Sequence, residues 1–252
     1  MLLRLTILVF CLLSATPLQA GDITLDADKQ VEYYQKEQKL VASGNAVAAK
    51  DDLSIHADTL IGYYNPEIKN KISRLEAHDN VKMVSSQTQA SGNNLVYDVK
   101  TDTAVLKGSP ARIKTPDAVI TAEGDITYYQ TAQKAIATKN VIATDADGNK
   151  VYADLMTAWF TTDKTGKMVL DKIDIEQNVK IVSKDAEVTA LKGTYYAASG
   201  KIKLFDNVII KQGGNILKGS KAETDLNTGI SKILSGGLKE RVSGIFKEKK
   251  KE

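Results

Sequence analysis

Residues 45–64 read NAVAAKDDLSIHADTLIGYY, and this stretch contains two phrases that return along most of the chain. One phrase is Asn followed by Val, either directly or after one residue. The other is a small residue with an aromatic residue six positions later, here Ala57 and Tyr63. The aromatic position returns about every 31 residues, and a fixed period of this length is typical of repeat proteins. We therefore expect stacked units that bury one continuous core, with a function distributed along its length.

Both phrases recur in phase. The small and aromatic pairs are Ala27/Tyr33, Ala57/Tyr63, Ser91/Tyr97, Ala122/Tyr128, Ala153/Trp159, Ala190/Tyr196 and the weaker Ser220/Leu226. The Asn and Val pairs are Asn45/Val47, Asn80/Val81, Asn140/Val141, Asn178/Val179 and Asn207/Val208, with Ser109-Pro110 in the matching place of the third copy. The recurrence predicts about seven repeats.

The segments around these phrases alternate between apolar and polar residues. Leu53, Ile55 and Ala57 alternate with Ser54 and His56, for example. A period of two with β-branched residues is the pattern of a β-strand, and the polar segments between the runs are rich in Gly, Asn and Asp, which favour turns. No amphipathic helix is evident, so the sequence predicts an all-β, open stacked solenoid.

Apolar residues at matching positions predict three ladders along the molecule. The first is Val47, Val81, Val141, Val179 and Val208; the second is Ala49, Met83, Ala143, Ile181 and Ile210; the third is Leu25, Ile55, Ile120, Val151 and Val188. Gln89 and Lys218 interrupt the third ladder. Because residues of one parity share a face of a sheet, the ladders predict an apolar side. That side is either a sealed core or, where the sheets do not close, a groove.

The N-terminal segment has the pattern of a cleaved secretion signal. Arg4 is its only charge, the run Leu5–Leu13 is apolar, and Leu18-Gln19-Ala20 is an acceptable cleavage site. The apolar run is shorter than the roughly 20 residues that span a bilayer. We therefore expect a signal peptide over residues 1–20 and export of the mature protein.

The remaining chain divides into the repeats, over residues 21–238, and a basic tail, over residues 239–252, which we expect to be solvated. The single cysteine, Cys11, lies in the signal segment. The mature chain then has no disulfide and no thiolate zinc site, so burial and backbone pairing must hold it together.

Charge and composition argue against two classes of binding site. The net charge is +3 at pH 7, and the tail contributes the positive surplus. The repeats are therefore close to neutral, whereas a nucleic-acid-binding fold carries a basic face. His56 and His78 lie far apart in sequence, while a metal pair needs closer spacing or added acidic ligands. We expect no nucleic-acid partner, no metal and no cofactor.

Acidic residues recur one position after the small residue of the repeat, at Asp28, Asp58, Glu123 and Asp154. A glycosidase needs two carboxylates in one cleft, whereas these are spread evenly over the repeats. We expect each to bond the backbone amides of a turn, and we assign no catalytic residues and no enzymatic activity.

These residues resemble the signature of the LptA/OstA-like family. Val41–Val47 and Leu53–Leu60 match its glycine-asparagine-valine turn and its isoleucine-x-alanine-aspartate corner, and the similarity extends over about residues 22–246. Later copies replace Gly44 of the signature with Asp79, Lys139, Gln177 and Asp206, so the resemblance alone does not predict that all corners turn alike.

The resemblance implies a β-jellyroll of stacked V-shaped layers with an apolar interior, in a periplasmic protein that transports lipopolysaccharide. The acyl chains of lipid A would lie in the interior and the sugars in water. It also implies head-to-tail self-association and pairing with an LptC-like inner-membrane partner and an LptD-like outer-membrane partner. Unpaired strand edges at the two ends are suited to such pairing.

On this reading, the acyl chains contact Leu25, Val47, Ile55, Val81, Met83, Ile120, Val141, Val151, Val179, Ile181, Val188 and Val208. The partner edges contain Ile23, Leu25, Ile230, Ile233 and Leu234. Two other functions stay open. A polymerising structural scaffold would share the edges but have a closed, dry core. A carbohydrate-active β-solenoid enzyme would concentrate charged residues in one or two repeats.

Overall fold

The alternating segments form β-strands throughout a computed structural model that describes residues 23–65, 71–225, 228, 230–237 and 241–246. Within these residues, eighteen strands form one antiparallel sheet and no helix is present, which confirms the predicted all-β fold. The predicted signal segment, residues 1–20, lies outside the described residues. The predicted tail is described only over residues 241–246. The count of about seven repeats stays a prediction.

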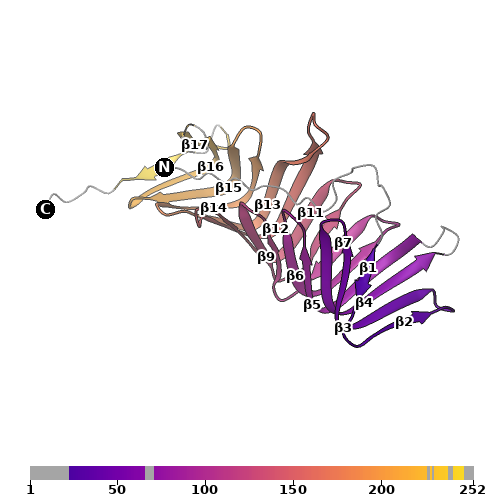
Figure 1. Ribbon diagram of the computed structural model, residues 1–252. Helices are drawn as coiled ribbons and strands as arrows, with labels where there is room; N and C mark the ends of the chain where they lie inside the picture. The colour runs from indigo at the N-terminus through magenta and orange to yellow at the C-terminus, as the bar shows by residue number, and fades with distance from the viewer. Residues whose placement is uncertain (1–22, 66–70, 226–227, 229, 238–240, 247–252) are drawn as a thin grey trace.

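The strands are β1 (Thr24–Asp26), β2 (Gln30–Tyr34), β3 (Lys39–Lys50), β4 (Leu53–Asn65), β5 (Lys71–Val84), β6 (Gln89–Asp98), β7 (Thr103–Lys107), β8 (Ala111–Lys114), β9 (Ala118–Ala122), β10 (Ile126–Tyr129), β11 (Lys134–Asp145), β12 (Lys150–Thr162), β13 (Met168–Val182), β14 (Ala186–Tyr196), β15 (Lys201–Gln212), β16 (Asn215–Asp225), β17 (Ile230–Leu234) and β18 (Ser243–Ile245). They form an elongated, twisted stack that runs from β2 and β3 at one end to β16 and β17 at the other (Figure 1).

Each long strand takes part in two arms of the stack. β3 pairs with β2 through Lys39–Ser43 and with β1 through Val47–Ala49. The first arm contains β2, β7, β10, β17 and the half of each long strand that pairs within the same part of the sheet. The second arm contains β1, β8, β9 and β18 with the remaining halves. β18 pairs with β16, so the sheet extends into the segment predicted as a tail.

The arms meet at corners formed by the Asn phrase. The pairing register shifts at each of these points, for example between Thr138 and Val141. The two residues at each shift have positive φ, namely Gly44-Asn45, Asp79-Asn80, Lys139-Asn140, Gln177-Asn178 and Asp206-Asn207. Such a bulge bends the strand. All five corners therefore turn in the same way, although four of them lack the glycine of the signature.

A hydrogen bond between side chains fastens four of the corners. The Asn side-chain amide donates to a carboxylate of the neighbouring strand or turn in the pairs Asn45/Asp28, Asn80/Asp58, Asn140/Glu123 and Asn178/Asp154, over 2.6 to 2.9 Å. The expectation that these carboxylates bond backbone amides was therefore wrong about the partner. The bulge turns each Asn outward, where its amide reaches the recurring acid.

Apolar residues of the two arms form two continuous inner rows. The second-arm row is Leu25, Ala48, Ile55, Met83, Ala90, Ile113, Ile120, Ala143, Val151, Ile181, Val188, Ile210, Leu217 and Gly244. The third predicted ladder and four of the five members of the second thus alternate within one row. The placement of Ala49 was wrong, because Ala48 occupies the row and Ala49 pairs with Thr24 and Ser54 on the other face. Ala90 and Leu217, rather than Gln89 and Lys218, occupy it, so the expected interruptions do not occur.

The outer face of the first arm carries a cluster of paired polar side chains around Asp174. Asp174 accepts hydrogen bonds from Trp159 Nε1 at 2.8 Å, Lys172 Nζ at 2.8 Å and Thr194 Oγ1 at 2.9 Å. Partial burial raises the pKa of Asp174, but these three donors together outweigh burial, so the net pKa is lowered from 3.8. The Lys134 and Lys172 ammonium groups also lie over the Trp159 ring.

Substitution of a corner asparagine is expected to destabilise the protein. Asn178→Ala removes the bond to Asp154 and places alanine, which adopts positive φ less readily than asparagine, at a φ of 54°. The free energy of unfolding should therefore fall by about 2 kcal/mol. Urea unfolding followed by the fluorescence of Trp159, the only tryptophan, measures this. Asn178→Gly loses the bond but tolerates positive φ, so it should cost less. Equal costs for the two variants would contradict the conformational part of this account.

Asp174 is expected to contribute stability that depends on pH. Because its folded-state pKa is lowered, the contribution is present above pH 3.8 and is lost as the pH falls through the folded-state pKa. Asp174→Asn should therefore destabilise the protein by about 1 kcal/mol at pH 7 and by less near pH 3. Urea unfolding at both pH values tests this, with the exposed Asp185→Asn as control. A cost for Asp174→Asn that does not change with pH would refute it.

Candidate functional site

Two apolar cavities lie between the arms. One has a volume of about 150 Å³ and is lined by Leu53, Ile55, Leu75, Met83, Ala90, Leu95, Tyr97, Ala104, Leu106, Ile113, Ile126, Tyr128 and Gln130. The other has a volume of about 100 Å³ and is lined by Ile113, Thr115, Ile120, Ile126, Ala135, Ala137, Ala143, Val151, Met156, Ala158, Phe160, Leu170, Ile173, Ile175, Ile181, Tyr195 and Ile202. We call them the N-terminal and C-terminal cavities.

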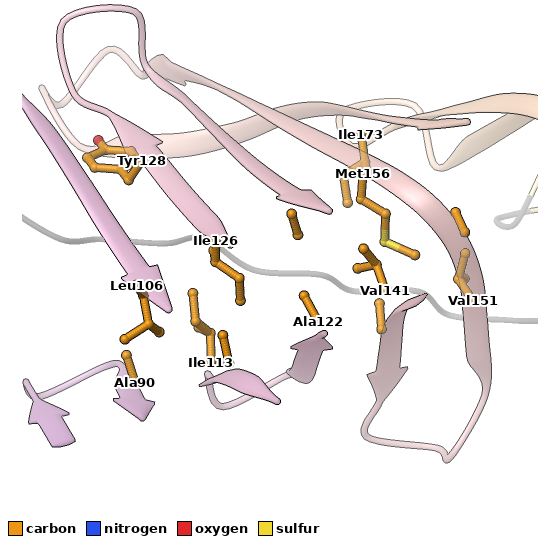
Figure 2. Close-up of a cluster of buried hydrophobic side chains, with 14 of the residues drawn as sticks. Ala90, Leu106, Ile113, Ala122, Ile126, Tyr128, Val141, Val151, Met156 and Ile173 are labelled. Atoms are coloured by element: carbon orange, nitrogen blue, oxygen red, sulfur yellow. The ribbon is translucent and has the colours of Figure 1, made fainter. Parts of the chain in front are cut away.

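Side chains from both arms face each other across this interior. Figure 2 shows Ile126 and Met156 on one side and Ile113 and Val151 on the other, pointing into the space between. The first-arm inner row is Val31, Ala42, Leu60, Ala77, Leu95, Leu106, Ile126, Ala137, Met156, Ile175, Gly193, Leu204, Ala222 and Ile233. The interior is therefore apolar along the whole length of the stack.

The few polar groups of the lining are neutral. The Thr115 hydroxyl donates to the Ala118 carbonyl. The Tyr97 hydroxyl donates to Asp102, and burial together with this bond raises the pKa of Tyr97 to about 12, so it stays protonated at neutral pH. Gln130 Oε1 is buried without a partner in the described structure. This lining suits an uncharged, apolar ligand.

Eleven of the twelve residues predicted to contact acyl chains face this interior, in three groups. Ile55 and Met83 line the N-terminal cavity, whereas Ile120, Val151 and Ile181 line the C-terminal cavity. Val81, Val141, Val179 and Val208 lie directly at the corners and are at most 2% exposed, so they belong to the sealed part of the core. Leu25 and Val188 are partly buried against the core.

The placement of Val47 on the interior ladder was wrong. Val47 pairs with His56, which is exposed, and therefore lies on the outer face of the second arm. Ala46, which is fully buried, occupies the place that valine has at the other corners. The first copy has one more residue between Asn and Val than the others, so counting from the valine reversed the parity.

The sequence analysis did not include the first-arm half of the interior. Met156, Phe160, Ile173, Ile175 and Tyr195 line the C-terminal cavity from this arm. A signal for them exists, because apolar residues also alternate just before each Asn, as in Ile173 and Ile175 before Asn178. The ladders were counted only on the other side of the corner.

Both ends of the stack expose apolar side chains beside unpaired strand edges. In the described part of the chain, β1 and β2 pair only with β3, and β17 and β18 only with β16. Exposed apolar residues gather there: Ile23, Val31, Tyr33 and Tyr34 at one end, and Ile230, Leu234, Val242, Ile245 and Phe246 at the other. Of the predicted edge residues, Ile23, Ile230 and Leu234 are exposed, and Leu25 and Ile233 are partly buried. Their role in partner binding stays a prediction.

The described residues lack two further kinds of feature. No helix there has the length and apolarity needed to cross a membrane. No cluster of three or more His, Cys, Asp or Glu side chains suited to a metal ion occurs in the same part of the chain.

Comparison with known proteins identifies the family. The family model described as "LptA/(LptD N-terminal domain) LPS transport protein" matches residues 24–134 and 124–230. No curated protein sequence matches the chain. Among similar solved structures is that of LptH from Pseudomonas aeruginosa, described as the LptA homologous periplasmic component of the lipopolysaccharide transport device. It is 11% identical over 90% of this chain and 96% of that chain, with a TM-score of 0.23. The family match covers most of the chain, which therefore belongs to the family of LptA and LptD N-terminal-domain lipopolysaccharide transport proteins.

Proposed function

We propose that this protein is a periplasmic, non-enzymatic carrier that takes the acyl chains of lipopolysaccharide between its two arms and leaves the sugars in water. The observation that carries the proposal is the apolar interior, with two inner rows that extend along the stack and cavities between them. Family membership supports a role in lipopolysaccharide transport.

The energetics of acyl chains favour such a carrier. Burying one methylene is worth about 0.8 kcal/mol, so a chain of roughly twelve carbons costs on the order of 10 kcal/mol to hold in water. A continuous apolar interior removes this barrier without any chemical step. Binding acyl chains in this interior includes no energy-releasing reaction. On this proposal, the energy that drives transport therefore comes from a partner.

Loading requires the arms to separate. An apolar cavity of about 150 Å³ holds a molecule of the size of benzene, so each cavity here admits only a short part of an acyl chain. Four corners are fastened by the Asn and carboxylate pairs, whereas farther from the corners the apolar side chains of the two arms enclose the cavities. Opening therefore occurs by movement of the arms about the corners.

The ends of the stack support assembly in line with other copies and with like-folded domains. An unpaired edge offers backbone donors and acceptors to another strand, and the exposed apolar residues at both ends add area for burial. Joining the end with β17 to the end with β2 would bring the inner rows of two copies into line. On this proposal, LptC-like and LptD-like partners occupy the two outer ends. The cavities favour this carrier over a scaffold with a closed, dry core.

Photo-crosslinking in cells tests lipid carriage directly. A photoreactive residue at Ile55 or Ile181 should give lipopolysaccharide adducts, since both side chains line cavities. The matched controls are Val47 and Lys180, which lie on the outer face of the same arm, and these should give none. Equal labelling of inner and outer positions, or no labelling of the inner ones in exported protein, would refute the proposal.

Substitution at one end is expected to disrupt self-association. Val31 ends the first-arm inner row and is 50% exposed. Val31→Asp would place a charge in the joint, so sedimentation velocity should detect loss of the larger assemblies. Leu191 is also 50% exposed but lies in β14, away from the ends, and Leu191→Asp should leave the assemblies unchanged. If both variants behave alike, head-to-tail docking at this end is wrong.

A further inference from the structure

Two residues stand between the N-terminal and C-terminal cavities. Ile113 and Ile126 are the residues that line both cavities, and each is only 4% exposed. Ile113 lies in β8 of the second arm and Ile126 in β10 of the first arm. Figure 2 shows the two side chains pointing toward each other from opposite sides of the interior. They form the boundary that the two cavities share.

This boundary lies at the level where the repeat pattern of the Asn phrase and the long strand is interrupted. Between the two end pairs, β1/β2 and β17/β18, long strands pass through the corners, but here β7 is separated from β8 and β9 from β10. Ser109-Pro110 replaces the Asn phrase between β7 and β8, and a proline side chain cannot make the bond that fastens the other corners. The two family-model matches, residues 24–134 and 124–230, also meet here, and their overlap contains Ile126. Each match therefore contains most of the residues that line one of the two cavities alone.

We propose that the chain holds two acyl-chain compartments in series, one in each half, and that Ile113 and Ile126 form a gate between them. The proposal rests on the proposed function, because it assigns acyl chains to both cavities. The gate residues are apolar and so do not repel an acyl chain chemically. They obstruct it by volume alone, and passage from one half to the other requires the two side chains to move apart. The lipid then advances in two steps within one molecule.

The test enlarges one gate residue and follows lipid on both sides. Photoreactive residues at Met83 and Ile181 report the N-terminal and C-terminal compartments in cells. Ile126→Phe should keep adducts in the compartment where lipid enters and reduce those in the other by about tenfold, since the larger ring fills more of the space that an acyl chain must pass through. Ile113→Phe, from the facing arm, should give the same asymmetry and serves if Ile126→Phe does not fold. Ile126→Ala should preserve adducts on both sides.

Matched controls separate the gate from bulk and from stability. Thr127→Phe and Arg112→Phe place the same ring on the outer faces of the same strands, so they should leave both adducts unchanged. The unfolding midpoint of each variant confirms that it is folded. Equal retention or equal loss on the two sides in a folded Ile126→Phe or Ile113→Phe protein would overturn the gate. Absence of adducts from both positions in the otherwise unaltered chain would instead overturn the proposed function, on which the gate rests.

Discussion

The structure depends on the backbone conformation of two consecutive residues at each corner. Left-handed φ at these residues bends a strand that would otherwise continue straight, and the Asn side chain fixes the bend by bonding a carboxylate beside it. The bend repeats in register, so apolar residues on both sides of the corner face each other instead of water. Without it, the same alternating pattern would form one flat sheet with an exposed apolar face.

Packing differs between the corner and the arms, and this difference relates the fold to its proposed function. The corner valines are almost completely enclosed, as in an ordinary protein core. Farther from the corner, side chains of the two arms enclose cavities with an apolar lining. Stability is thus concentrated along the corners, and the space between the arms is left less densely packed. A carrier needs both, since it must stay folded while its contents change.

Much of this was predictable from the sequence, and the errors have physical causes. The period, the strands and the second-arm row follow from residues such as Ile55, Met83 and Ile181. The assignment of Val47 failed because the first corner has one more residue between Asn and Val than the other corners, so a count from the valine reverses the alternation. The first-arm row was missed for a related reason, as its alternation ends at the Asn. The hydrogen-bond partner of each corner carboxylate depends on the direction in which the bulge turns the Asn side chain. The spacing of residues in the sequence gives no information on that direction.

The most direct test of the central claim, that acyl chains bind between the arms, is the distance between the arms with and without lipid. Spin labels at Thr157 of the first arm and Lys180 of the second lie on outer faces, and the chain after residue 20 contains no cysteine to interfere. Pulsed electron paramagnetic resonance should detect a longer distance between the two spin labels after addition of lipopolysaccharide. The distance should not change after addition of the same saccharide without its acyl chains. An unchanged distance with bound lipopolysaccharide would contradict the account.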